Sequence, residues 1–198
     1  MDILVLSKCF RHGRSALNKN DLLRQAVEAA WKTGIVVVVA AGNDGRGNSH
    51  KTNGYETISS PGNDPYAITV GAINTRETAT RTDLVAPGNT IISALALGGR
   101  YRNTYHANSV PQSFYVKNGD PGNADTYFTL SGTSMAAPMV SGAVALMLQK
   151  DSSLTPDQVK ARLMKTASKT FPAQVTLKAP DGTSYTVQHD VFDRRRLS

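Results

Sequence analysis

The sequence predicts an α/β fold, with a mainly parallel sheet flanked by helices. Two observations carry this prediction. First, residues 35–40 (IVVVVA) form a β-branched run without polar alternation, which is typical of a strand buried on both faces of a parallel sheet. Second, short apolar runs alternate along the chain with segments of helical periodicity, which is the order of elements expected when helices cover a parallel sheet.

The composition is that of a globular chain with a hydrophobic core. Its 198 residues are enough for one domain, and 40% of them are hydrophobic. The net charge is +7, but no basic stripe is interleaved with aromatic residues, so we expect no nucleic-acid partner. A single cysteine, Cys9, excludes an internal disulfide and offers no metal cluster. No apolar run is long enough to span a membrane, and residues 1–10 lack the pattern of a signal peptide, so we expect no membrane partner.

The first elements follow from local patterns. Residues 3–6 are an apolar run that predicts a short buried strand. Asn20 is placed to cap the helix that follows, and Gly34 is placed to end it just before the buried strand. Between them, apolar residues recur at helical spacing and predict the buried face of this helix: Leu23, Ala26, Val27, Ala30 and Trp31.

Two further strands are expected in the middle of the chain. Residues 67–72 (AITVGA) predict one of them, and residues 84–86 predict a short one that ends at Pro87 and Gly88. Residues 98–126 are rich in Gly, Asn, Tyr and Asp and predict a long irregular excursion.

The C-terminal third predicts two helices and a hairpin. The first helix covers about residues 134–150, and we expect Pro138 in its first turn, where a proline is tolerated. The second begins at Thr155-Pro156-Asp157, an N-cap followed by proline and an acidic residue. Residues 175–187 predict a hairpin that turns at residues 180–182.

Ser134 is a candidate nucleophile because it follows a tight turn, Gly132-Thr133, at the start of a helix. Unpaired amide groups and the positive end of the helix dipole lie at such a position and favour a developing negative charge. Gly132 has no side chain to block a substrate. The structural alternative is that Ser134 is the N-cap of the helix, a common place for a serine.

Asn43 is a candidate donor to an oxyanion. It follows directly after the strand 35–40, at the carboxyl end where α/β proteins build their sites, and its amide can donate a hydrogen bond there. The alternative is a turn asparagine, because Asn-Asp-Gly is ordinary turn chemistry.

Taken together, five segments resemble the subtilases, the subtilisin-like serine peptidases. They occur in the family's order: VVVVAAGN, SSPGNDPYAITVGA, LVAPG, GTSMAAPMVSGAVALML and LTPDQVKARLMKTA. The resemblance implies a subtilisin-like fold and is clearest over about residues 20–170. We therefore expect residues 1–170 to be a partial, N-terminally incomplete catalytic domain and residues 171–198 to be a divergent C-terminal segment.

The resemblance also implies a reaction and a set of residues. It makes the chain a serine endopeptidase domain that hydrolyses peptide bonds through an acyl-enzyme on Ser134, with Asn43 in the oxyanion hole. The implied substrate-binding residues are Ala41, Gly42, Ser60, Gly62, Gly132 and Thr133. A general α/β hydrolase is disfavoured, because the serine lies in Gly-Thr-Ser-Met and not in a Gly-x-Ser-x-Gly elbow.

The expected Asp and His of the triad are not identifiable. Both should precede Asn43, where the only histidine is His12 and the only aspartates are Asp2 and Asp21. His12 begins HGRSALN, which departs from the family's His-Gly-Thr-His, and a solvated loop histidine is the alternative. We therefore expect little or no activity from this chain, unless a partner segment supplies the Asp and His. A second hypothesis is a catalytically silent, peptide-binding remnant.

The remaining expectations come from the family. The partner is a peptide or protein substrate, and the chemistry requires no cofactor. Subtilases often bind structural calcium, but no ligand cluster for calcium stands out in this sequence. Family members are commonly secreted, so analogy favours an extracellular location.

Overall fold

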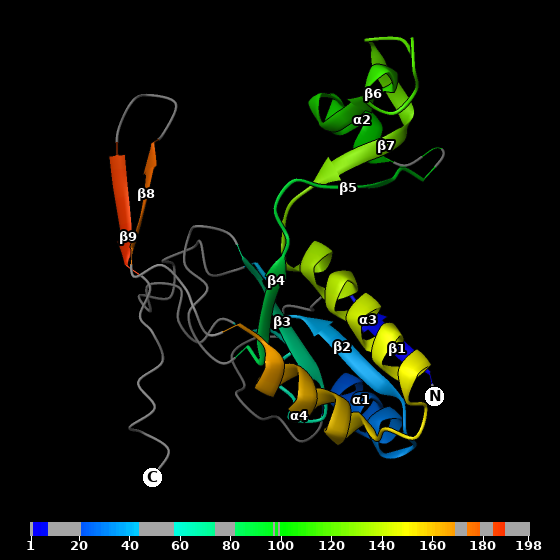
Figure 1. Cartoon of the computed structure of the whole chain (residues 1–198), viewed down its shortest axis with the longest axis vertical. Coiled ribbons are helices and arrows are strands. Elements are labelled where there is room, and N and C mark those ends of the chain that lie inside the picture. Colours follow the sequence, from blue (N-terminus) through cyan, green and yellow to red (C-terminus); the bar gives the residue numbers. More distant parts are fainter. Residues whose placement is uncertain are drawn as a thin grey trace.

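A computed structural model describes residues 2–7, 21–43, 58–73, 82–96, 98, 100–168, 174–178 and 184–188. A parallel sheet forms its centre (Figure 1). Neighbouring strands run in the same direction, with Val38 paired to Ile68 and Val70 paired to Leu84. This confirms the predicted α/β class. The strands lie in the order in which they follow one another in the chain: β1 (Ile3–Leu6), β2 (Val36–Ala40), β3 (Ile68–Ile73) and β4 (Leu84–Pro87).

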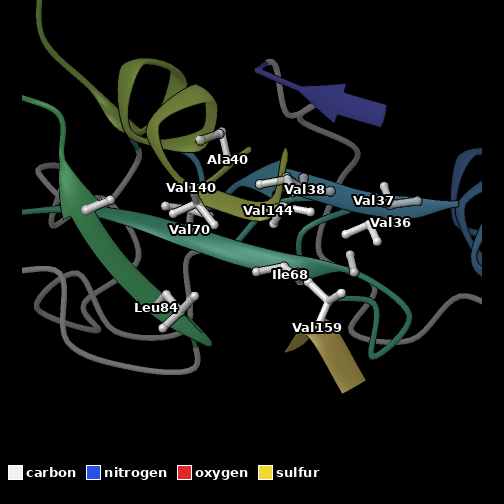
Figure 2. Packing of buried hydrophobic residues seen from close by; sticks show 14 of the residues in the cluster. Val36, Val37, Val38, Ala40, Ile68, Val70, Leu84, Val140, Val144 and Val159 are labelled. Atoms are coloured by element: carbon white, nitrogen blue, oxygen red, sulfur yellow. The ribbon is translucent and has the colours of Figure 1, made fainter. Parts of the chain in front are cut away.

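Strand β2 lies in the middle of the core, as its sequence predicts. All five of its residues are buried, and Val36 to Val39 have no exposed surface. Because successive side chains of a strand point to opposite faces, both faces of β2 must be covered. Helix α3 (Thr133–Lys150) packs along the sheet with Val140 and Val144, while Val159 of α4 (Pro156–Thr166) lies next to Ile68 (Figure 2).

Helix α1 (Leu22–Lys32) begins one residue later than the sequence predicts. Its N-cap is Asp21, whose Oδ1 accepts a hydrogen bond from the Leu23 N–H at 3.0 Å. The prediction of Asn20 as the cap is therefore wrong, because the aspartate carboxylate fulfils that function; Asn20 itself lies outside the described residues. The helix ends as expected near Gly34, which has a φ of +96°.

Helix α1 is fastened to α4 through its last buried residue. The indole N–H of Trp31 donates to Asp157 Oδ1 at 3.0 Å, and Trp31 is 4% exposed. Helix α4 itself starts as predicted. Thr155 Oγ1 accepts from the Gln158 N–H, and Gln158 Oε1 accepts from the Thr155 N–H, which makes a complete capping box.

Strand β1 exists where it is predicted, but it is not buried. Leu4 and Val5 are 40% and 38% exposed. Within the described part of the sheet β1 is an edge strand, and β2 is the strand that pairs with it. A neighbouring strand therefore lies along only one flank of β1, and the expectation of a buried strand is wrong for this reason.

The predicted irregular excursion is instead an ordered lobe with its own antiparallel sheet. It rises from the end of β4 and returns at the start of α3 (Figure 1). Phe128 forms part of its interior, with 3% exposure and the ring of Tyr101 at 6.4 Å. The lobe consists of β5 (Ile91–Ala94), α2 (Arg100–Thr104), η3 (His106–Asn108), β6 (Ser109–Pro111), η4 (Gln112–Phe114) and β7 (Asn123–Leu130), and its sheet has the order β5-β7-β6.

Two predictions in the C-terminal third have different outcomes. Pro138 lies inside α3 and not in its first turn, because the helix already begins at Thr133. The hairpin is confirmed: β8 (Gln174–Lys178) pairs antiparallel with β9 (Ser184–Gln188). Its predicted turn at residues 180–182 lies outside the described residues.

Candidate active site

The candidate site lies at the carboxyl edge of the parallel sheet, where β2 ends and α3 begins. The Ala41 N–H extends the pairing of β2 with β3 by donating to the Val70 carbonyl at 2.9 Å. Gly42 then turns the chain with a φ of +98°, and Asn43 follows as an exposed residue. The core thus fixes the point at which the Asn43 side chain leaves the sheet.

Thr133 connects Asn43 to the start of α3. Its hydroxyl accepts a hydrogen bond from the Gly42 N–H at 3.2 Å and lies 3.3 Å from Asn43 Oδ1, to which it can donate. Its backbone N–H also donates to Asn43 Oδ1 at 3.1 Å. Thr133 is 1% exposed, so these contacts join the exposed Asn43 to a buried residue, the one that precedes Ser134.

These contacts determine which end of the Asn43 amide faces outward. A backbone N–H can only donate, so the Asn43 atom that faces Thr133 N must be the oxygen. The Nδ2 group, a pure donor, is therefore directed away from this contact. A donor held by a buried threonine is what an oxyanion hole requires, and this long-range contact goes beyond the local turn of the alternative interpretation.

Two glycines allow this approach. Gly132 has a φ of +149°, and a Cβ placed on it would lie 3.2 Å from Asn43 Nδ2. The Gly132 N–H donates to the Gly88 carbonyl at 2.7 Å. A Cβ on Gly88 would lie only 2.7 Å from the Gly132 carbonyl oxygen and 2.7 Å from Ala72 Cβ. The LVAPG and SGTS segments therefore meet backbone to backbone.

Ser134 lies within the first turn of α3 and is half-exposed. The N-cap of the helix is Gly132, so the alternative interpretation of Ser134 as the N-cap is wrong. Its hydroxyl donates a short hydrogen bond to the Ser7 carbonyl, directly after β1. The Ser134 side chain therefore points away from α3, toward the carboxyl edge of the sheet, where Asn43 also lies.

The predicted pocket wall runs beside Ala41 and Gly42. The Ser59 N–H points to the Ala41 carbonyl at 3.4 Å, and a Cβ on Gly62 would lie 3.2 Å from the Ala40 carbonyl oxygen. The Thr69 hydroxyl donates to the Gly62 carbonyl at 2.5 Å. The structure thus places residues 59–62 next to the turn at Gly42.

All six predicted substrate-binding residues lie in three neighbouring segments, residues 41–42, 60–62 and 132–133, although their roles remain predictions. Ala41, Gly62 and Thr133 are buried, so they shape the backbone of the site. Gly42, Ser60 and Gly132 are half-buried.

No base was identifiable from the sequence, and the one histidine weighed for that role is not among the described residues. His12 lies outside them, and the single histidine that the structure does describe, His106, belongs to the lobe in η3. Asp21 is engaged elsewhere: one carboxylate oxygen caps α1, and the other accepts a hydrogen bond from the Ser60 hydroxyl. Across the described ranges, no group of three or more His, Cys, Asp or Glu side chains is arranged to hold a metal ion.

Sequence reasoning missed two features of the site. It gave Thr133 a role in substrate binding but not its bonds to Gly42 and Asn43, and it did not connect Asp21 with Ser60. Asp21 could have been found as a helix cap from its place before a helix. Its contact with Ser60, 39 residues further along the chain, has no signal in the local sequence.

Comparisons with known proteins agree with this geometry. Residues 6–188 match the model of the subtilase family. Serine protease AprX of Bacillus subtilis is 38% identical over 165 residues, which are 73% of this chain and 33% of AprX. Subtilisin DY of Bacillus licheniformis is 36% identical over 146 residues, which are 74% of this chain and 44% of that protein.

A solved structure supports the same assignment. A cold-adapted subtilisin-like serine proteinase superposes with a TM-score of 0.55 and 28% identity, covering 84% of this chain and 48% of that one. The chain spans a third to a half of the length of these relatives. Among the helices of the described residues, none has the length and apolar character needed to cross a membrane. By fold, motifs and similarity, the chain belongs to the subtilase family.

Proposed function

We propose that this chain carries the nucleophile and the oxyanion donor of a serine endopeptidase. The observation that carries the proposal is the Thr133 contact, which holds Asn43 by its oxygen at the residue before Ser134. In the proposed reaction, Ser134 Oγ attacks the carbonyl carbon of a peptide bond. The carbonyl oxygen becomes an oxyanion that accepts hydrogen bonds from Asn43 Nδ2 and from the amide groups at the start of α3.

The proton on Ser134 Oγ limits this chemistry. In the structure it is donated to the Ser7 carbonyl, and an amide carbonyl is far too weak a base to remove it. A serine without a base is a neutral alcohol and a poor nucleophile near neutral pH. For subtilisin, a member of this family, the oxyanion hole and substrate binding alone leave about 10³–10⁴-fold acceleration over water. We therefore propose that the chain alone is weakly active or inactive.

A segment that supplies an Asp and a His would complete the proposed enzyme. It would have to place an imidazole within hydrogen-bonding reach of Ser134 Oγ, in competition with the Ser7 carbonyl. We propose a peptide or protein as the substrate, no cofactor in the chemistry, and an extracellular location by analogy with the family.

The test uses covalent labelling of the serine, in which Ser134 Oγ attacks the phosphorus of a fluorophosphonate and displaces fluoride. The chain is incubated with a fluorophosphonate probe, with and without added imidazole as a diffusible base, and Ser134→Ala serves as the control. We expect negligible labelling without imidazole and Ser134-dependent labelling with it. Rapid labelling without imidazole that Ser134→Ala abolishes would contradict the proposal that the chain alone is weakly active or inactive. Labelling that survives Ser134→Ala would contradict the assigned nucleophile.

One observation favours a second candidate, the peptide-binding remnant. The Ser134 hydroxyl already has an acceptor within the chain, so the serine has a structural bond whether or not it reacts. Under this alternative, peptides bind to the chain, but imidazole produces no labelling of Ser134.

A further inference from the structure

The segment that carries the predicted pocket wall, residues 58–67, has few bonds of its own. We call it the wall segment. Within it, the Gly62 N–H donates to the Ser59 carbonyl at 2.8 Å and the Asp64 N–H donates to the Pro61 carbonyl at 3.0 Å. Both are local turns. Turns of this kind set the shape of a loop but not its distance from the rest of a site, so bonds to other elements must set that distance.

The first of these bonds comes from the N-cap of α1. The two oxygens of the Asp21 carboxylate contact different parts of the chain. Oδ1 accepts from the Leu23 N–H and starts the helix, while Oδ2 accepts a short hydrogen bond from the Ser60 hydroxyl. A single side chain thus links the start of α1 to the middle of the wall segment.

The second bond comes from the first turn of the same helix. Arg24 Nε donates to Asp64 Oδ2 at 2.8 Å, and the side chain of Asp64 is only 2% exposed. The other Asp64 oxygen accepts from the Tyr66 N–H at 2.9 Å. The charge of Arg24 therefore pairs with a buried carboxylate, which also accepts a hydrogen bond from the wall segment just before β3.

The wall segment faces the site from the other side. The Ser59 N–H points to the Ala41 carbonyl, and a Cβ on Gly42 would lie 3.6 Å from Ser59 Oγ. A shift of the wall segment would therefore change its separation from the Gly42 turn, which also carries Asn43. A pocket discriminates between side chains only if its walls hold their distance when a poorly fitting group enters.

Lys160 of α4 holds the far end of the wall segment, where its Nζ donates to the carbonyls of Pro65 and Ala67 at 3.2 and 2.7 Å. We propose that Asp21 and Arg24 are positioning residues, through which the first turn of α1 sets the distance between the nearer end of the wall segment and the Gly42 turn after β2. The inference rests on the proposed function, because it treats the wall segment as a substrate surface. It makes α1 a determinant of specificity, although the helix itself contributes no residue to the predicted pocket. The simpler view is that Asp21 is only a helix cap.

Three variants separate the two views. Asp21→Asn keeps both contacts, because its oxygen can accept from the Leu23 N–H and its amide can donate to the Ser60 hydroxyl. Asp21→Ser keeps a strong N-cap but is too short to reach Ser60 as well. Ser60→Ala removes the contact from the other side and leaves the cap intact. Glu28→Gln, at a partly exposed position of α1, makes the same charge change without touching the wall segment, since the partner of Glu28 is Lys32 on the same helix.

Amide hydrogen exchange of the whole chain, resolved by mass spectrometry, measures the tether directly. We expect exchange in residues 58–67 to become about tenfold faster in Asp21→Ser and Ser60→Ala, the change that loss of one charge-assisted hydrogen bond gives. Glu28→Gln should match the parent chain. Asp21→Asn should exchange more slowly than Asp21→Ser, because it keeps a neutral hydrogen bond to Ser60, and β2 should be unchanged in all four variants. Equal exchange in Asp21→Ser and Asp21→Asn would overturn the proposal. If exchange in β2 also becomes faster in Asp21→Ser, that variant has disturbed the whole fold. The exchange of residues 58–67 in Ser60→Ala, which leaves the cap intact, then tests the proposal.

Peptide binding tests the consequence for specificity. In a Ser134→Ala background, fluorescence polarisation compares labelled tetrapeptide amides that end in Phe, Leu or Ala. We expect the ratio of their affinities to fall several-fold in Asp21→Ser, which changes no residue of the wall segment. Peptides that bind with unchanged ratios would overturn the positioning role. Failure of every peptide to bind the parent would contradict the proposed function, while the exchange result would still decide whether the tether exists.

Discussion

Gly88→Ala tests the close approach on which the site depends. A Cβ at this position would lie 2.7 Å from Ala72 Cβ, 2.7 Å from the Gly132 carbonyl oxygen and 3.1 Å from Ala136 Cβ. Carbon atoms in contact normally lie about 3.5–4.0 Å apart, so the overlap with Ala72 is roughly 0.8 Å or more. None of these neighbours is the flexible end of a side chain, so strand β4 or the start of α3 must move.

The expected cost follows from this overlap. Overpacking a core costs about 1–3 kcal/mol, and the upper end applies because the neighbours are backbone or buried alanine. The alanine also reduces the entropy of the unfolded chain, which offsets about 0.4–1 kcal/mol. We expect the free energy of unfolding to fall by about 2 kcal/mol. We also expect imidazole-dependent labelling of Ser134 to fall, because Gly132 precedes Thr133 and the nucleophile.

Gly142→Ala is the matched control. Gly142 lies within α3, where a Cβ meets nothing within 4 Å. Alanine in an exposed helix interior should stabilise the chain by about 0.5–1 kcal/mol. Urea denaturation followed by circular dichroism should therefore separate the two variants by about 3 kcal/mol. A Gly88→Ala chain that unfolds at the parent's urea concentration would refute the backbone contact between β4 and α3.

Three further changes test other contacts. Arg24→Ala should lower the free energy of unfolding by about 3–5 kcal/mol, because it leaves the buried Asp64 carboxylate without its cationic partner. The double variant Arg24→Ala with Asp64→Ala should lose less stability in the same urea titration, and an equal loss in the two variants would argue against the ion pair. Thr133→Val should lower imidazole-dependent labelling by about tenfold or more while Thr133→Ser keeps it, because the bond from Gly42 and one of the two bonds to Asn43 need the hydroxyl. Equal labelling rates in the two variants would count against this role. Asn43→Ala should lower the same labelling rate by about 10²–10³-fold, a magnitude established with subtilisin, a member of this family, and a small effect would remove Asn43 from the oxyanion hole.

The central layers of the fold could be predicted because their signals are local. Strand β2 is a continuous β-branched run, and the capping box of α4 lies within four adjacent residues, Thr155 to Gln158. The error at the start of α1 was a single residue. Asn20 and Asp21 are both good caps by residue type, so local sequence does not distinguish them.

The lobe could not be predicted for the opposite reason. Strands β5 and β7 pair Ile92 with Thr129 across a long, polar intervening segment, and β6 joins the same sheet with an irregular register. Neither β6 nor β5 has the alternating pattern that marks an isolated strand. Its order comes from pairings between distant residues and from the buried ring of Phe128, which sequence periodicity does not encode.

In the candidate site, too, the residues had local signals in the sequence and the contact between them had none. Ser134 and Asn43 were predicted as residue types in recognisable segments, but the bond that relates them passes through Thr133, 90 residues from Asn43. The exposure of β1 is a similar case, since an apolar run indicates a strand but not how many neighbours it has.

The contacts of Thr133 bear on how the two proposed residues are held. Asn43, the proposed donor, leaves the sheet at the end of β2, and Ser134, the proposed nucleophile, lies in the first turn of the helix that covers the same strand. One hydrophobic core therefore sets both positions. In the proposed reaction, a base has only to approach Ser134 Oγ and replace the Ser7 carbonyl as the acceptor of its proton. Binding geometry and proton removal are therefore physically separable in this chain, which is why an added base is the decisive reagent: it should restore acylation without changing how Asn43 and Ser134 are held.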